Sequence, residues 1–256
     1  MTDVNLFAGE SLRSSFAEMA ERFAERFGAR VTSTFGPSGL LAERIARGEP
    51  CSVFAAADLA SAESVAAKTA APVIVFARNI IGALANARLK AATTSLLSLM
   101  LDPRIRLGIA TPKASPAGDS AWEIFRRADI ARPGSFAVLS TKATKLVGGR
   151  DSPPPPRGQD LYVWLIESDQ VDIFLTYRTN AMPAARASAA LDFIELPDIL
   201  SVGTDYGLIV TDEQNPLAAK FALFVMSPEG QRILGRHGFK TVNEPALRPS
   251  SPDLRP

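Results

Sequence analysis

The chain places serine residues where an apolar strand pattern gives way to a helical one, and this placement could bind an anion. Ser38 is the clearest case, because apolar residues alternate before it and an apolar stripe at helical spacing begins at Leu40. The first backbone amides of a helix have no partner inside the helix, so such a junction can take a capping hydroxyl or an anion. Similar junctions of small residues occur around Ser11, Ala57 and Ala117. Together they predict a site that holds a small ligand with hydroxyls and backbone amides.

The same serine could instead be a nucleophile, but its surroundings argue against that chemistry. Ser38 stands in Gly36-Pro37-Ser38-Gly39, which lacks the Gly-x-Ser-x-Gly spacing of a nucleophile elbow. The single histidine, His237, lies far along the chain, so a general base for Ser38 is not expected. A phosphate-binding P-loop pattern is also absent from the sequence. We therefore expect a binding protein and not an enzyme, with a hydrolase that uses Ser38 as the less favoured alternative.

Each candidate residue taken singly also fits a plain structural role. Ser11 and Ser38 both stand where a serine commonly caps a helix. Tyr177 fits an aromatic residue at the edge of a core with its hydroxyl in water. Only the occurrence of these residues together supports the binding interpretation.

The composition excludes several classes of partner. Lysine and arginine number 28 against 27 aspartate and glutamate residues, so no basic surface for nucleic acid is expected. One cysteine, Cys51, and one histidine predict neither a disulfide framework nor a metal site rich in these ligands. No apolar run reaches the roughly eighteen residues that span a bilayer. Because residues 1–3 lead straight into the first predicted strand without a signal peptide, we expect a protein that is either cytosolic or exported with its leader removed.

Strand and helix patterns alternate along the chain, which favours an α/β fold with a parallel sheet. The apolar spacing and cap residues predict helices over 12–27, 40–47, 59–68, 93–101, 120–128, 159–168, 217–226 and 229–236. Alternating or buried apolar runs predict strands over 4–8, 30–35, 52–56, 72–77, 79–87, 106–110, 171–176, 192–196 and 206–211. A crossing between domains is expected at residues 77–79.

Three further stretches have their own signatures. Ser227 and Pro228 predict the cap and the first residue of the last helix. The proline-rich stretch 146–158 predicts a surface loop, because proline lacks the amide donor that a helix interior or a central strand needs. The tail from Pro245 is rich in proline, serine and charge and is expected to be disordered.

Taken in order, these segments resemble the periplasmic substrate-binding proteins of molybdate and tungstate ABC transporters. The resemblance covers residues 4 to about 242 and is carried by Phe7-Ala-Gly-Glu-Ser11-Leu12, Phe35-Gly-Pro-Ser38-Gly-Leu, residues 48–58, Pro116-Ala117-Gly118 and Phe174-Leu-Thr-Tyr177-Arg-Thr-Asn-Ala. It implies a two-lobed α/β fold with two crossing segments and a ligand cleft between the lobes. Residues 1–78 and 205–256 would form lobe 1, and residues 79–204 would form lobe 2.

The resemblance also implies a ligand and the residues that hold it. In that family neutral donors bind the oxyanion, and the matching positions here are Ser11, Ser38 and Ala57 in lobe 1 and Ala117, Gln159 and Tyr177 in lobe 2. Molybdate and tungstate carry no proton near neutral pH, so every contact can be a donor, whereas hydrogen phosphate needs an acceptor for its proton. The implied protein is a periplasmic monomer without a cofactor, and it delivers the anion to a membrane ABC permease.

Three departures from the family pattern leave the identity of the anion open. Cys51 stands near a position that is usually acidic, Gln159 occupies an often apolar position, and Asp119 replaces an apolar residue two positions after Ala117. Asp119 could repel an anion or accept a proton from one, and Arg178 could offset its charge. Phosphate, sulfate and small organic anions therefore stay as alternative ligands, and a cytosolic effector-sensing domain stays as an alternative class.

Overall fold

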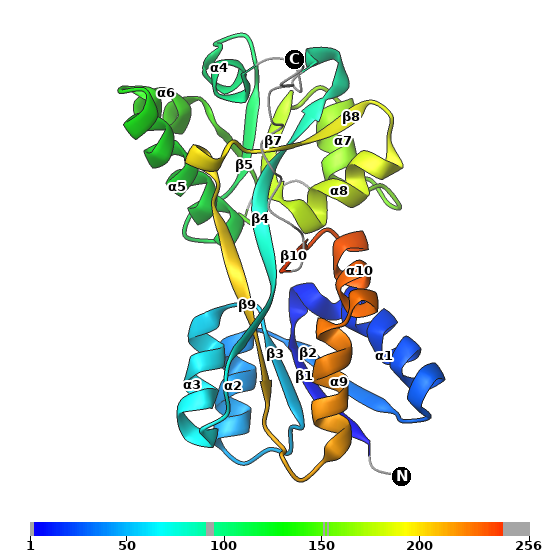
Figure 1. Cartoon of the computed structure of the whole chain (residues 1–256). Helices are drawn as coiled ribbons and strands as arrows, with labels where there is room; N and C mark the ends of the chain where they lie inside the picture. Colours follow the sequence, from blue (N-terminus) through cyan, green and yellow to red (C-terminus); the bar gives the residue numbers. More distant parts are fainter. Residues whose placement is uncertain (1–2, 91–94, 151, 153, 243–256) are drawn as a thin grey trace, which may run out of the picture. The chain divides into compact units, whose positions relative to one another are not determined.

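The computed structural model describes residues 3–90, 95–150, 152 and 154–242, and the chain divides into two compact units (Figure 1). Unit 1 holds the chain up to Arg78, Asp205–Arg236 and the residues from Lys240, and unit 2 holds Asn79–Thr204 and His237–Phe239. The sequence places His237–Phe239 in the first lobe, and the structure corrects this assignment. The reason is that the Arg178 guanidinium of unit 2 donates hydrogen bonds to the carbonyl oxygens of Gly238 and Phe239.

Unit 1 is built on a sheet whose first three strands are parallel. β1 (Val4–Gly9) lies between β2 (Val31–Gly36) and β3 (Val53–Ala56), with Gly9 opposite Gly36 and Ala8 opposite Ala55. β9 (Gly203–Val210) runs antiparallel to β3, and the first part of β4 (Ile74–Asn86) pairs with the short β10 (Lys240–Thr241). The carboxyl ends of β1, β2 and β3 therefore meet at one edge of the sheet.

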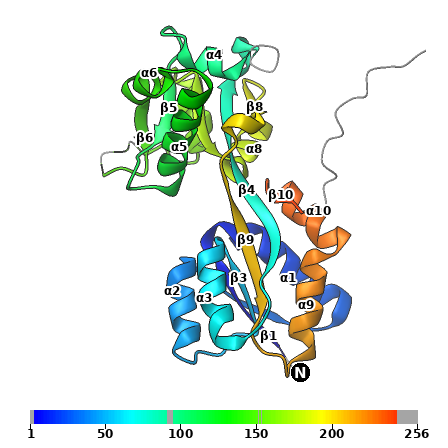
Figure 2. The same cartoon turned by 60° about the vertical axis from the view of Figure 1, so that its left-hand side comes forward.

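Helices cover both faces of the unit 1 sheet. α2 (Ser38–Ala46) and α3 (Leu59–Thr69) lie on one face, and α1 (Arg13–Phe27) and α9 (Pro216–Met226) lie on the other, with α10 (Pro228–Arg236) beside α1 (Figures 1 and 2). Under α1 and α9 the core is aromatic, with edge-to-face contacts of Phe16 and Phe23 on Phe221. The Ser227 hydroxyl accepts a hydrogen bond from the Gly230 amide, so the predicted start of α10 is confirmed.

Unit 2 has its own sheet, in the order β8-β4-β7-β5-β6. The later part of β4 runs antiparallel to β7 (Ile173–Tyr177) and to β8 (Leu191–Glu195), and β5 (Leu107–Ala110) is parallel to β7 and to β6 (Thr144–Val147). A side chain at Gly82 of β4 would place its Cβ 2.2 Å from the ring of Phe193, so the close pairing of β4 with β8 requires glycine there.

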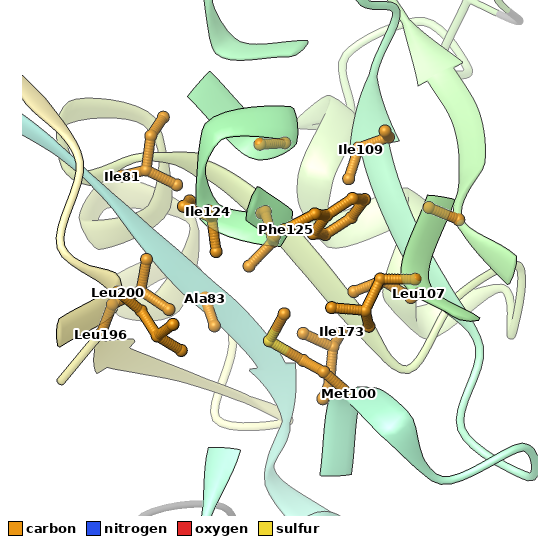
Figure 3. Close-up of a cluster of buried hydrophobic side chains, with 14 of the residues drawn as sticks. Ile81, Ala83, Met100, Leu107, Ile109, Ile124, Phe125, Ile173, Leu196 and Leu200 are labelled. Atoms are coloured by element: carbon orange, nitrogen blue, oxygen red, sulfur yellow. The ribbon is translucent and has the colours of Figure 1, made fainter. Parts of the chain in front are cut away.

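Two layers of helices enclose the unit 2 sheet. α4 (Leu96–Leu101), α5 (Pro116–Ala131) and α6 (Ser135–Lys142) cover one face, where the buried core gathers around Phe125, Ile124 and Ile109 (Figure 3). α7 (Leu161–Glu167) and α8 (Arg178–Ala187) cover the other face over Phe174. Three short 3-10 turns complete the described chain, over Glu10–Leu12, Ala87–Leu89 and Asp198–Leu200. No helix among the described residues is both long and apolar enough to cross a membrane.

Several elements differ from the sequence prediction. β4 is one strand through residues 77–79, where the sequence predicts two runs, because Arg78 stays in the ladder opposite Lys240 and its guanidinium bonds to Asp205 at 2.7 Å. The sequence predicts neither α6 nor α8, and Pro183 inside α8 obscures that helix. α5 begins at Pro116, before the predicted residue 120, and β6 takes up residues 146–147 of the predicted loop as an edge strand. The tail from Pro245 lies outside the described residues.

Candidate anion-binding site

The three predicted site residues of unit 1 all follow a strand at the same edge of the sheet. Ser11 lies in the 3-10 turn after β1, Ser38 is the first residue of α2 after β2, and Ala57 follows β3. In open α/β sheets ligands bind outside the carboxyl ends of the strands, because the loops and helix starts gather there. The parallel pairing of β1 with β2 and β3 thus puts the three positions at one edge of the sheet, although they are up to 46 positions apart in the sequence.

Ser38 is bonded to the turn that carries Ala57. Its side chain is buried, and its Oγ accepts a hydrogen bond from the Ala57 backbone amide at 2.9 Å. The N-cap position of α2 is Pro37, and no side-chain cap hydrogen bond is formed there, so Ser38 does not play the plain capping role that its position suggests. A serine hydroxyl can accept and donate at the same time. Because the Ala57 amide can only donate, the Ser38 proton remains available for an acceptor. The predicted anion donor at Ala57 is itself occupied by Ser38 in this structure.

Gly9 at the end of β1 permits this close arrangement. A Cβ at Gly9 would lie 2.8 Å from the Ala57 Cβ and 3.1 Å from both the Ala57 nitrogen and the Ser38 Oγ. Any larger residue would therefore push Ser38 and Ala57 apart. Gly9 is not among the predicted site residues, although it stands in the segment that carries the family resemblance.

Ser11 is exposed, and its Oγ lies 2.9 Å from the Tyr206 hydroxyl. Tyr206 belongs to β9, is 4% exposed and packs its ring edge-to-face on Phe76. The sequence gave no sign of this partner, since the two residues are 195 positions apart. Like Ser38, Ser11 does not cap the following helix with its side chain.

The two carboxylates next to these donors in sequence already have partners. Glu10, which precedes Ser11, accepts a hydrogen bond from the Arg13 guanidinium at 2.7 Å. Asp58 follows Ala57 and caps α3, where its carboxylate accepts hydrogen bonds from the Ser61 amide at 2.6 Å and the Ser61 hydroxyl at 3.0 Å. Cys51, before β3, donates its thiol to the Val53 carbonyl, and burial raises the pKa of this thiol to about 11. The thiol is therefore protonated near neutral pH and is a poor nucleophile. Among the described residues no cluster of three His, Cys, Asp or Glu side chains could hold a metal ion.

In unit 2, Ala117 is the second residue of α5 and is buried. The first amides of a helix have no carbonyl partner one turn back, so the Ala117 amide is a candidate anion donor. Gly118 lets this helix start lie against the end of β5, because a Cβ there would come within 2.6 Å of the Ala110 oxygen. The side chain of the N-cap residue, Ser115, makes no cap hydrogen bond.

The charged residues near these unit 2 positions form hydrogen bonds and ion pairs within the protein. The Asp119 carboxylate accepts a hydrogen bond at 2.8 Å from the amide of Lys113, a residue with a positive φ of 64°. Arg178 lies 3.3 Å from the Glu195 carboxylate and donates to the carbonyl oxygens of Gly238 and Phe239. Arg178 therefore balances Glu195, which corrects the suggestion that it offsets Asp119.

The other two predicted donors of unit 2 differ in their present bonding. Tyr177 ends β7, is half-buried and packs on the core around Phe125, and its hydroxyl makes no hydrogen bond within the described ranges. The Gln159 amide donates to the Pro156 carbonyl at 3.1 Å, so this predicted donor is occupied by a turn. The segment that contacts the loop before α5 is Gly148–Gly149, where a Cβ on Gly149 would lie 2.8 Å from the Thr111 hydroxyl oxygen.

Two α/β units with donor-rich strand ends define a class of protein, the solute-binding proteins with the periplasmic-binding-protein fold. The chain belongs to the bacterial extracellular solute-binding protein family, whose sequence profile matches residues 4–240. It is therefore a solute-binding protein and not an enzyme.

Similar proteins agree on the fold and differ in what they bind. The uncharacterized protein PM1146 of Pasteurella multocida is 30% identical over 80% of this chain and 86% of its own length. The molybdate-binding protein ModA of Mycobacterium tuberculosis is 26% identical over 91% of this chain and 83% of its own. A structure described as the substrate-binding domain of a molybdenum ABC transporter from Clostridium difficile matches with a TM-score of 0.73 and 19% identity, over 94% of this chain and 99% of its own. The sulfate-binding protein SubI of Mycobacterium tuberculosis matches with a TM-score of 0.63 and 17% identity, over 95% and 88%.

Proposed function

We propose that this solute-binding protein captures a proton-free tetrahedral oxyanion, molybdate or tungstate, for an ABC importer. The observation that carries the proposal is the bond from the Ala57 amide to the Ser38 hydroxyl at the edge where three strands end. This bond leaves Ser38 with a proton to donate and fixes the oxygen that carries it. Ser11 adds a second hydroxyl in the same unit. The relatives that bind molybdate make this anion the first to test.

The chemistry of the donors favours an anion without a proton. Hydroxyls and amides can donate to every oxygen of such an anion, and helix starts add partial positive charge without a counter-ion. Hydrogen phosphate would need an acceptor for its proton, and the carboxylates next to the donors in sequence, Glu10, Asp58 and Asp119, are held by Arg13, Ser61 and Lys113. Leaving its proton unpaired would cost about 1–3 kcal/mol, which favours molybdate over phosphate.

The donors of unit 2 are proposed to contact the same anion. The Ala117 amide stands at a helix start and the Tyr177 hydroxyl has no other partner within the described ranges, so both can donate. Gln159 can contribute its amide only if the turn to Pro156 opens. We propose that the protein acts as a periplasmic monomer without a cofactor and that its partner is a membrane permease.

A sulfate-binding function is the second candidate, because sulfate also carries no proton and fits the same donors. The likeness in fold to the sulfate-binding protein SubI supports testing it. Hydrogen bonding alone does not discriminate between sulfate and molybdate. The size of the cavity around the bound anion would have to provide that selectivity.

Thermal unfolding with molybdate, tungstate, sulfate, phosphate and acetate, each at millimolar concentration, tests the proposal. A ligand at a hundred times its Kd adds about 2.7 kcal/mol of stability. We expect a large rise in Tm with molybdate and tungstate, and none with phosphate or acetate. A rise with sulfate alone would favour the second candidate. A rise with phosphate alone would refute the proton-free ligand, and a rise with acetate alone would refute a tetrahedral oxyanion.

A further inference from the structure

We infer that Tyr206 is a positioning residue for the anion site, because its hydroxyl orients Ser11 to donate its only proton to the ligand. The inference rests on the proposed function, in that it assumes an oxyanion at the strand ends of unit 1. It adds a residue from β9, a strand that carries none of the predicted donors.

Packing and strand pairing hold the Tyr206 side chain in place more firmly than the Ser11 side chain. Tyr206 is 4% exposed, its ring packs on Phe76, and its neighbour Gly207 pairs with Ala56 in the sheet. Ser11 is exposed and lies in a short 3-10 turn. A free serine side chain in such a turn would sample several rotamers. The hydrogen bond of 2.9 Å to a buried, fixed phenol oxygen selects one of them.

The direction of this hydrogen bond follows from what the ligand can do. Either hydroxyl can donate to the other, since each oxygen carries one proton and can also accept a hydrogen bond. An oxyanion without a proton can only accept, so Ser11 must donate to it, and Tyr206 must then donate to Ser11. Hydrogen bonds in such a chain polarise one another, which strengthens the contact to the ligand.

Ser38 and Ser11 therefore differ in a way that can be measured. The Ala57 amide can only donate, so the direction of its bond to Ser38 is fixed. The Ser11–Tyr206 pair can reverse, so its orientation is set only when the anion binds. Tyr206 should then matter for binding only while Ser11 has its hydroxyl.

A double-mutant cycle on the full chain tests this dependence. Calorimetric titration with molybdate would compare Tyr206→Phe, Ser11→Ala and the double variant with the wild type. We expect Tyr206→Phe to weaken molybdate binding about fivefold to tenfold in the wild type, and less than about twofold in the Ser11→Ala background. Tyr162→Phe is the matched control, because it removes a phenol that bonds to Thr176 and Asn180 of unit 2 and should change the Kd less than about twofold.

The outcomes separate this inference from the function on which it rests. An equal loss from Tyr206→Phe in both backgrounds would mean that Tyr206 acts without Ser11, and unchanged or tighter binding by Tyr206→Phe would mean that it does not orient a donor; each result overturns the inference and leaves the function standing. Failure of the wild type to bind any of the oxyanions would overturn the proposed function and the inference with it.

A second measurement needs no substitution at Tyr206. The chain has only three tyrosines, so ring-labelled tyrosine gives three carbon NMR signals, and the Tyr162→Phe and Tyr177→Phe variants assign the third to Tyr206. We expect saturation with molybdate to shift the Tyr206 phenol carbon in the wild type and not in Ser11→Ala. Equal shifts in the two proteins, or no shift in either, would overturn the inference.

Discussion

The candidate donors of the two units differ in how they are held. In unit 1 each predicted hydroxyl bonds to a group that is distant in sequence, Ser38 to Ala57 and Ser11 to Tyr206. In unit 2 the Tyr177 hydroxyl makes no hydrogen bond within the described ranges. Groups that are already oriented lose little freedom when a ligand binds, whereas mobile groups must be ordered at that moment. Unit 1 thus offers hydroxyl oxygens that are already held in place, and unit 2 offers a hydroxyl that a ligand must fix.

The largest expected effect comes from Ser38→Ala, which removes one of the two hydroxyls that are held in place in unit 1. The substitution removes a donor to the anion and leaves the Ala57 amide without its acceptor. We expect a loss of about 1.5–3 kcal/mol in molybdate binding, or roughly tenfold to 150-fold in Kd. Calorimetric titration measures it directly.

A matched control lies in the same unit. Ser52 is also buried, and its Oγ accepts a hydrogen bond from the Asn5 amide at 3.2 Å just before β3, at the opposite end of that strand from Ala57. Ser52→Ala should leave the Kd within about twofold of the wild type. If Ser38→Ala bound molybdate as tightly as Ser52→Ala does, the preorganised site would not be where we place it.

The second effect tests what holds unit 2 together apart from any ligand. The Asp172 side chain is 5% exposed, and its carboxylate accepts from the Arg106 amide at 2.8 Å and from two nitrogens of the Arg106 guanidinium. Asp172→Asn should lower the free energy of unfolding by about 2 kcal/mol near neutral pH and leave the Kd for molybdate unchanged. Urea unfolding of both proteins measures the difference, and Asp192→Asn, at an exposed aspartate of the same unit, is the control.

The pH dependence of that difference has a definite sign. The hydrogen bond from the Arg106 side chain holds the pKa of the Asp172 carboxyl well below its ordinary value. A carboxyl whose folded pKa is depressed contributes stability that is complete above its unfolded pKa of about 3.9 and is lost as the pH falls from there through the folded pKa. The gap between wild type and Asp172→Asn should therefore shrink below about pH 4. A gap that stayed constant into acid would show that the carboxylate charge is not what stabilises unit 2.

The third effect distinguishes a ligand-facing hydroxyl from a structural one. Tyr177→Phe should weaken molybdate binding by about 1 kcal/mol, roughly fivefold, and leave Tm unchanged, because the hydroxyl has no partner to lose within the described ranges. Tyr162→Phe should do the reverse, since its hydroxyl bonds to Thr176 and Asn180 and its burial raises the pKa of the phenol. Binding and melting experiments on the two variants would contradict the comparison if both lost stability and neither lost affinity.

The sequence was a good guide wherever local patterns decide the structure. Alternating apolar runs located β1, β2 and β3, and the residues after them reach one sheet edge because parallel strands share their direction. The same rule makes Ser38 and Ala57 neighbours, since each follows a strand beside β1. The start of α10 was also readable, because a serine cap and a proline at the first position act within one turn.

Features that depend on distant residues could not be predicted in this way. Tyr206 reaches Ser11 only because β9 enters the sheet beside β3, and nothing near either residue indicates that pairing. The continuity of β4 through Arg78 depends on Asp205 and Lys240, which lie far along the chain. α8 was missed for a local reason, since Pro183 and a polar first turn conceal its apolar face. The Gln159 amide was matched to a donor position by resemblance, which does not reveal its bond to Pro156.

The smallest expected effect concerns Asp119. A negative charge at this position could make unit 2, and not unit 1, determine which anion binds. Its carboxylate accepts from the Lys113 amide, and an asparagine at that position keeps an oxygen for this bond while it removes the charge. Asp119→Asn should tighten molybdate binding by less than about threefold. It removes the repulsion between the carboxylate and the anion, which water and salt already weaken at the surface. The ratio of phosphate to molybdate Kd should stay within about twofold of the wild type, because the Lys113 amide holds the Asp119 carboxylate on the loop before α5. Titrations with both anions measure this ratio, and Asp58→Asn makes the same change at the α3 cap of unit 1. A shift in the ratio for Asp119→Asn alone would mean that the Asp119 carboxylate leaves Lys113 and contacts the ligand, and unit 2 would then set the selectivity.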